Sequence, residues 1–171
     1  MPNQQERIKN RTLRNIPGDQ ITWRHMESSN NLSRYDREGV RYFAIKLSDE
    51  FAEELETEGW PVTWRDLNRN DPNADEPDMQ AYLKVFIKYG TRFPCDIYLV
   101  NANRKTKTLL DENDLDTLHI DAKDIETIDL LIRPYYWTYG DQHGIKAQVQ
   151  AMNILLSQSD LDDGYEIVYK D

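Results

Sequence analysis

The sequence of 171 residues predicts a small, mainly β barrel whose helices are confined to the connections between strands. Two observations predict this class. Five or more short segments alternate apolar and polar residues with the period of two that a pleated strand imposes. The helical patterns between them are brief. A chain of this length buries a sizeable core without disulfides or bound metal, so one domain is expected.

The first 40 residues are predicted to hold little regular structure. They contain a short strand over Ile8–Leu13, a turn at Pro17-Gly18 and a flexible polar loop over Glu27–Ser33. Tyr35–Gly39 is typical of a tight turn. It leads into a clear strand over Arg41–Leu47.

A short amphipathic helix is predicted directly after that strand. Ser48 is a good N-cap for a helix over Asp49–Glu56, with acidic residues in its first turn, and Gly59 is its expected end. Trp60–Arg65 then reads as a strand. Asn68–Asp78, with two prolines and no large apolar residue, is predicted to be a mobile loop.

The second half of the chain supplies the remaining strands. Tyr82–Tyr89 and Asp96–Val100 are predicted to pair, and the hairpin of Ile125–Arg133 with Ile145–Ile154 turns at Tyr139–Gly144. Between these pairs we expect a polar turn over residues 101–108 and a brief helix over residues 112–118. The pattern favours a five-stranded oligonucleotide-binding (OB-like) barrel with short connecting helices and long loops, with a β-sandwich as the competing fold.

Tyr82–Tyr89 carries the clearest functional pattern. Its odd positions form an aliphatic face, whereas Tyr82, Lys84, Phe86 and Lys88 share the other face. Rings that alternate with ammonium groups suit a polyanion whose bases can stack, which indicates single-stranded nucleic acid. The alternative is that these rings pack under a neighbouring loop while the lysines solvate an edge strand.

Aromatic residues also lie beside cations on other strands, and these residues complete the predicted nucleic-acid site. Stacking one base on such a ring contributes about 1 to 3 kcal/mol and tolerates any sequence. The candidate binding residues are Arg41, Tyr42, Lys46, Tyr82, Lys84, Phe86, Lys88, Arg133, Tyr135, Trp137 and Lys146.

The formal net charge of −10 argues against nonspecific nucleic-acid binding, but the charge is unevenly distributed. Residues 1–46 carry nine basic and five acidic residues, whereas Asp111–Asp129 contains eight carboxylates and one lysine. Such acidic runs are usually solvated faces. They could also keep duplex DNA away or engage a basic partner.

The sequence lacks the usual signals of an enzyme or a membrane protein. Cys95 is the only cysteine, and no spacing of histidine or cysteine is typical of a metal site, so neither a cofactor nor a metal is expected. No apolar run is long enough to cross a membrane, which favours a soluble intracellular protein. Two alternatives to DNA binding stay open: an acidic protein-interaction module or DNA mimic, and a metal-dependent nuclease that uses the acidic run.

From about Ile8 through Ile154 the chain resembles the single-stranded DNA-binding proteins of tailed bacteriophages. The resemblance rests mainly on Tyr35–Phe43, Ile125–Trp137 and Gly144–Ala147. It also includes four shorter motifs, which are Arg14–Gly18, Glu58–Trp60, Tyr82–Val85 and Leu110–Glu112.

The resemblance implies an OB-fold domain over residues 1–156 that coats single-stranded DNA without a cofactor, during phage DNA replication or recombination, in the cytoplasm of the infected bacterial host. Residues 157–171 would form an acidic C-terminal tail that recruits phage replication proteins. Three features depart from the family pattern. Asn68–Asp78 is longer, Gln148 stands where an aromatic residue is expected, and the tail is only moderately acidic.

Overall fold

A computed structural model of the protein describes residues 8–27, 40–101 and 106–157. The predicted turn at Tyr35–Gly39, most of the Glu27–Ser33 loop and nearly all of the tail lie outside these residues. The described strands are β1 (Arg11–Pro17), β2 (Ile21–His25), β3 (Arg41–Leu47), β4 (Val62–Asp66), β5 (Met79–Ile87), β6 (Asp96–Asn101), β7 (Thr106–Leu110), β8 (Ile125–Tyr139) and β9 (Gln142–Leu156). The helices are α1 (Asp49–Glu58) and α2 (Glu112–Thr117), with 3-10 turns at Gly18–Gln20 and Ile120–Ala122.

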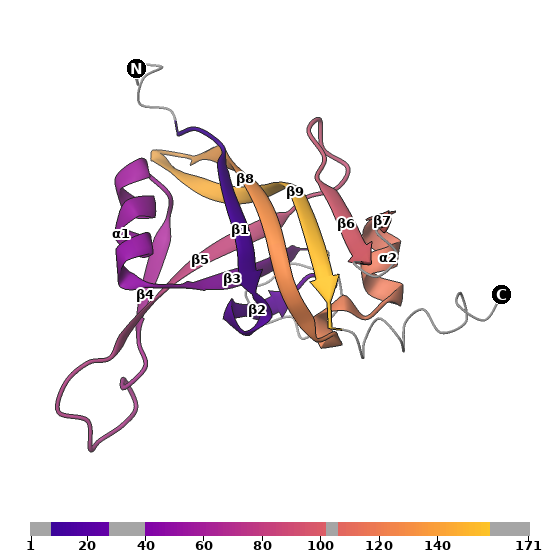
Figure 1. Ribbon diagram of the computed structural model, residues 1–171. Helices are drawn as coiled ribbons and strands as arrows, with labels where there is room; N and C mark the ends of the chain where they lie inside the picture. The colour runs from indigo at the N-terminus through magenta and orange to yellow at the C-terminus, as the bar shows by residue number, and fades with distance from the viewer. Residues whose placement is uncertain (1–7, 28–39, 102–105, 158–171) are drawn as a thin grey trace.

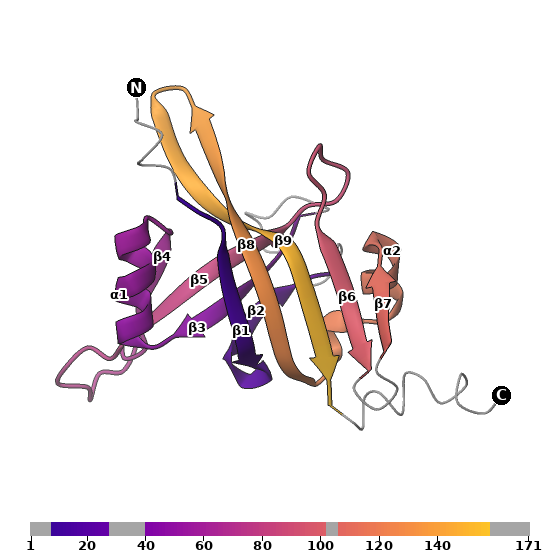
Figure 2. The ribbon, with the colours of Figure 1, turned by 45° about the horizontal axis from the view of Figure 1, so that its top comes forward.

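The strands form one strongly curled sheet in the order β1-β8-β9-β5-β3-β2 (Figures 1 and 2). β4 pairs with β5 off this path, and β6 joins β9 to β7. The predicted pairing of Tyr82–Tyr89 with Asp96–Val100 is therefore wrong, because β9 lies between β5 and β6. Most pairs are antiparallel, but β5 and β6 each run parallel to β9. The OB-like, mainly β prediction is confirmed. The barrel was expected to have five strands, whereas the described residues contain nine, of which seven match predicted strand segments.

The curled sheet encloses the hydrophobic core. Aliphatic side chains from one face of β3, β5, β8 and β9 are fully buried there, among them Leu83, Ile132 and Met152. β9 changes its alternation at a bulge, because Ile132 pairs with Val149 whereas Leu131 pairs with Ala151. β9 can therefore direct apolar side chains into the core on both sides of the bulge.

Local sequence signals position the first helix as predicted. The Ser48 side chain accepts a hydrogen bond from the Phe51 amide, and Gly59 ends α1 in the left-handed region at φ 107°. Leu55 is fully buried beneath α1. Trp64 on β4 packs against the core, and its indole Nε1 donates to Glu56 of α1 over 2.8 Å.

Two strands were not predicted. β2 carries an irregularity between Thr22 and His25, which breaks the simple alternation that reveals a strand. β7 follows a polar stretch and has four exposed residues in five, so its pattern is that of a turn. Its strand character comes from pairing with β6. In addition, β1 begins later than predicted and runs to Pro17.

The connection between β4 and β5 is long and extends away from the barrel (Figure 1). Hydrogen bonds within the loop hold its two ends together. The Asp66 carboxylate accepts from the amides of Asn68 and Asp78, each over 2.9 Å, and Asn73 donates its amide to Asp71. These Asx-type bonds explain the loop's richness in Asp and Asn.

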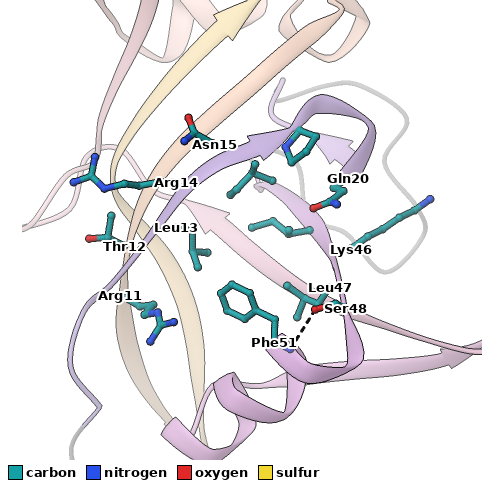
Figure 3. A pocket seen from close by; sticks show the side chains of 13 residues that line it. Arg11, Thr12, Leu13, Arg14, Asn15, Gln20, Lys46, Leu47, Ser48 and Phe51 are labelled. Carbon is teal, nitrogen blue, oxygen red and sulfur yellow. Dashed lines mark hydrogen bonds between the residues drawn. The ribbon is translucent and has the colours of Figure 1, made fainter.

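The sheet leaves a gap between β1 and β3, which holds a cavity of about 300 Å³. Figure 3 shows Leu13 and Phe51 within it, while Lys46 extends away from it. At one end Arg11 forms ion pairs with Glu54 at 2.9 Å and Glu58 at 2.7 Å. These carboxylates already neutralise Arg11.

Candidate nucleic-acid interface

The outer face of β3 and β5 carries the rings and cations that the alternation predicts. In the antiparallel register, Tyr42 lies opposite Phe86 and Lys46 opposite Tyr82. Lys84 lies opposite Ala44, a small residue that leaves room above it. The intervening residues of both strands point into the core. The face is therefore an outer surface of the barrel.

Trp23 of β2 covers one end of this face. Its φ of 49° falls at the irregularity of β2. The Trp23 ring stacks on Tyr82, with 4.4 Å between centroids and 24° between planes. The guanidinium of Arg65, from β4, lies 4.4 Å from the centroid of the Trp23 ring. Three strands thus build a layered stack of cation, indole and phenol.

A second stack lies beside the first. His25 stacks on Tyr42 at a centroid distance of 4.6 Å, and Lys84 Nζ lies 3.9 Å from the Tyr42 centroid. Tyr42 is 7% exposed and Tyr82 6% exposed. Neither belongs to the hydrophobic core cluster. Trp23 and His25 therefore cover Tyr82 and Tyr42 on the outer side. Of these four rings, those of Trp23 and His25 are the more accessible to a ligand.

Phe86 links this face to β9 and β8. Two ammonium groups lie near its half-buried ring, with Lys84 Nζ at 5.2 Å and Lys146 Nζ at 4.9 Å from the centroid. The parallel pairing of β5 with β9 puts Phe86 beside Gln148, and the antiparallel pairing of β8 with β9 puts Gln148 beside Arg133. The surface is continuous across three strands.

The β8–β9 hairpin extends the same face toward its tip. Tyr135 pairs with Lys146 and Trp137 pairs with Gly144, so both rings share the side of Arg133. A Cβ at Gly144 would lie 2.6 Å from the Trp137 ring. Gly144 is therefore needed for the indole to lie against the partner strand.

We expect Gly144→Ala to displace Trp137 and to weaken DNA binding by up to the value of one stacked base, about 1 to 3 kcal/mol. A fluorescence titration with oligo(dT) measures the change. Trp137→Ala should cause a similar loss, and the double variant should lose little more, because both changes remove the same ring. Fully additive losses would show that Gly144 does not act through Trp137.

A cavity of about 410 Å³ opens where β5, β8 and β9 meet. The Arg133 guanidinium lies 5.6 Å from the Phe93 ring centroid and donates a hydrogen bond to the Phe93 carbonyl. The Phe93 ring is 62% exposed. The residues that line the cavity are Lys88, Thr91, Arg92, Phe93, Arg133, Pro134, Tyr135 and Gln148.

The local charge of this surface is opposite to that of the whole chain. Three lining residues of the cavity are cations and none is acidic. The predicted acidic run is used elsewhere: Asp111 caps α2 by accepting from the Asp114 amide, and Asp121 accepts from the amides of Met26 and Glu27. The carboxylates of Asp111 and Asp121 are thus bound to backbone amides and do not line the cavity, so a protein with net charge −10 can have a locally basic cavity.

The structure brings the predicted site residues together on this face, with the exception of Arg41. Arg41 is buried, donates to the Met26 carbonyl over 2.6 Å and pairs with Asp116 at 3.0 Å. Tyr89, at the end of the predicted strand, also turns away and donates its hydroxyl to the Leu110 carbonyl. Burial raises the pKa of that hydroxyl above its ordinary value.

Sequence reasoning missed Trp23, His25 and Phe93. The segment from Ile21 to His25 combines a β-branched pair with an aromatic residue, which is a usable strand signal, but the bulge hides its register. Phe93 has no periodic signal because it lies in a loop. A loop aromatic between Arg92 and Pro94 could have been noted as an exposed ring beside a cation.

Comparison with known protein families gives a match over residues 2–170 to a family described as "Putative phage ssDNA-binding domain". The chain belongs to this family. No curated protein matches the chain. Among solved structures, the single-stranded DNA-binding protein of bacteriophage Enc34 is similar at 10% identity. Its complex with ssDNA has a TM-score of 0.48 and its C-terminal truncation 0.47, with 87% of each chain covered in both cases.

Within the described residues, no helix has the length and apolar character of a membrane span. In the same part of the chain, no group of three or more His, Cys, Asp or Glu residues is arranged to hold a metal ion.

Proposed function

We propose that this member of the phage ssDNA-binding family is a noncatalytic protein that coats single-stranded DNA during phage replication or recombination in the host cytoplasm. The observation that carries the proposal is the continuous outer face of β3, β5, β9 and β8. It combines accessible rings with cations, and a cavity without carboxylates opens on it. Bases would stack on the rings while the cations follow the phosphates.

The geometry favours a strand path from the β8–β9 hairpin across Phe86 toward Trp23. Phe93, Tyr135 and Trp137 offer surface at one end, and the Arg65–Trp23 stack does so at the other. In OB-folds the face of the second and third barrel strands and the adjoining loops binds oligonucleotides. β3, β5 and the β8–β9 hairpin occupy these positions, which supports the path.

Arg41 is left out of the proposed contacts because its guanidinium is buried in an ion pair. The proposed contacts are Trp23, Lys46, Arg65, Lys84, Phe86, Lys88, Arg92, Phe93, Arg133, Tyr135, Trp137 and Lys146. Tyr42 and Tyr82, which are 7% and 6% exposed, would instead support His25 and Trp23 from beneath. Residues 1–156 would form the binding domain, and residues 157–171 would form a tail that contacts phage replication proteins.

We expect binding to weaken steeply as salt rises. Each neutralised phosphate contributes a log–log slope of about −0.7 for single strands, so phosphate contacts from Lys46, Lys84, Lys88, Arg92 and Lys146 give about −3.5. The affinity for oligo(dT) should then fall roughly 100-fold between about 50 and 200 mM salt. Fluorescence titration at several salt concentrations measures the slope. Salt-independent binding, or no binding, would contradict the proposal.

The two alternative functions make different demands. A DNA mimic needs its carboxylates presented outward, whereas those of Asp111, Asp114 and Asp121 accept hydrogen bonds from backbone amides. A nuclease should cleave labelled single-stranded DNA when Mg²⁺ is added. We expect intact DNA after such an incubation, together with a retained DNA–protein complex.

A further inference from the structure

We propose that Gln148 and Arg133 form a base-reading subsite that distinguishes the group at C4 of a pyrimidine or C6 of a purine. It prefers a carbonyl oxygen there, as in thymine and guanine, over an amino group, as in cytosine and adenine. The inference rests on the proposed binding of single-stranded DNA. It adds a base preference to a surface whose stacking rings alone would accept every base.

Gln148 is the buried member of the cavity lining. Gln148 is 5% exposed, whereas Phe93 and Tyr135, which line the same cavity, are 62% and 50% exposed. A base stacked on either ring would therefore direct its edge toward Gln148. Phosphates would remain nearer the rim, where Lys88 and Arg92 are exposed.

The orientation of the Gln148 amide follows from its neighbour. Arg133 Nη2 donates toward Gln148 Oε1 over 3.4 Å and also donates to the Phe93 carbonyl. A guanidinium has donors only, so the amide oxygen must be the atom that faces it. In the part of the chain that the structure describes, the amide Nε2 of Gln148 has no hydrogen-bond partner. This nitrogen is available to a ligand.

The side chains at the inner part of the cavity thus offer donors. Gln148 presents Nε2, Arg133 presents its remaining N–H groups, and the nearby cation Lys88 also only donates. A base edge with a carbonyl acceptor can pair with these groups. An amino group would face another donor and lose its hydrogen bond to water without replacement, which is unfavourable in a dry site.

The test compares oligodeoxyuridine with oligodeoxycytidine of equal length at pH 8. The two bases have the same shape and differ in their hydrogen-bonding edge. The full-length wild-type protein should bind the uracil strand at least fivefold more tightly, at the lower end of what one good base contact gives. Gln148→Met, which keeps the length of the side chain but removes the donor, should reduce the ratio to less than twofold.

Gln148→Glu is a second test variant. Its carboxylate can pair with Arg133, so the variant should fold, and an acceptor replaces Nε2. The preference should then shift toward the cytosine strand. A wild-type ratio near one, or a ratio that persists in both variants, would overturn the subsite. If the wild-type protein binds neither strand, the proposed function itself fails, which is a different result.

Discussion

Phe86→Ala should weaken binding to oligo(dT) by about 1 to 3 kcal/mol, which is roughly 5- to 150-fold. The ring lies at the junction of β5 and β9, and Lys84 and Lys146 place their ammonium groups 5.2 and 4.9 Å from its centroid. Its removal takes away a stacking surface and also the group that positions both cations. Fluorescence anisotropy with a labelled strand measures the loss.

The chain offers a matched control in Tyr98 on β6. Lys107 Nζ lies 4.6 Å from the Tyr98 centroid, so this ring has a cation above it as Phe86 does, but it is held by the β6–β7 pair. Tyr98→Ala should leave the affinity within about twofold. Phe86→Tyr, which keeps a ring, should also bind nearly as well as wild type. Equal losses for Phe86→Ala and Tyr98→Ala would remove Phe86 from the proposed path.

Arg41 should prove to be a stabilising residue with no direct part in DNA binding. Its buried guanidinium joins β3 to the carbonyl of Met26 and to Asp116 of α2. Removing one partner of a buried ion pair costs about 3 to 5 kcal/mol, because the other charge is left without compensation. Asp116 is partly exposed, at 35% of its side chain, so we expect Asp116→Ala to lower the free energy of unfolding by about 2 to 3 kcal/mol.

Substitutions of Arg41 can be compared with substitutions of Lys46, a cation that is exposed on the outer face of β3. Arg41→Met should lower the urea midpoint while the folded protein retains its affinity for oligo(dT). Lys46→Met should leave the midpoint unchanged and reduce both the affinity and its salt slope, by about 0.7 if Lys46 neutralises one phosphate. If Arg41→Met instead reduces affinity without loss of stability, Arg41 is a DNA contact after all.

Only the structure shows that Arg41 stabilises the fold and does not lie on the candidate binding face. In the sequence, Arg41 and Lys46 are both cations near the ends of the same strand, and Arg41 lies directly beside Tyr42. Arg41 has the inward parity of Phe43, and at the end of β3 that side is covered by α2, which supplies the carboxylate of Asp116. No local pattern reveals this contact, because 75 residues separate its partners.

Alternation by itself determined most of the fold of this protein and which side chains share the central face of the candidate interface. The period of two in β3 and β5 assigned Phe43, Leu83 and Val85 to the core and placed Tyr42, Lys84 and Phe86 on the opposite face, because successive side chains of a strand point to opposite sides. The capping residues Ser48 and Gly59 likewise determined where α1 begins and ends, because a cap acts within one helical turn.

Only the tertiary structure decided which separate segments meet on that face. Trp23 reaches Tyr82 through a bulge in β2, and Phe93 reaches Arg133 from a loop. Gln148 joins Phe86 only through the parallel pairing of β5 with β9. Such contacts depend on how the sheet curls, and the curl is set by the packing of the whole core, which no local repeat in the sequence encodes.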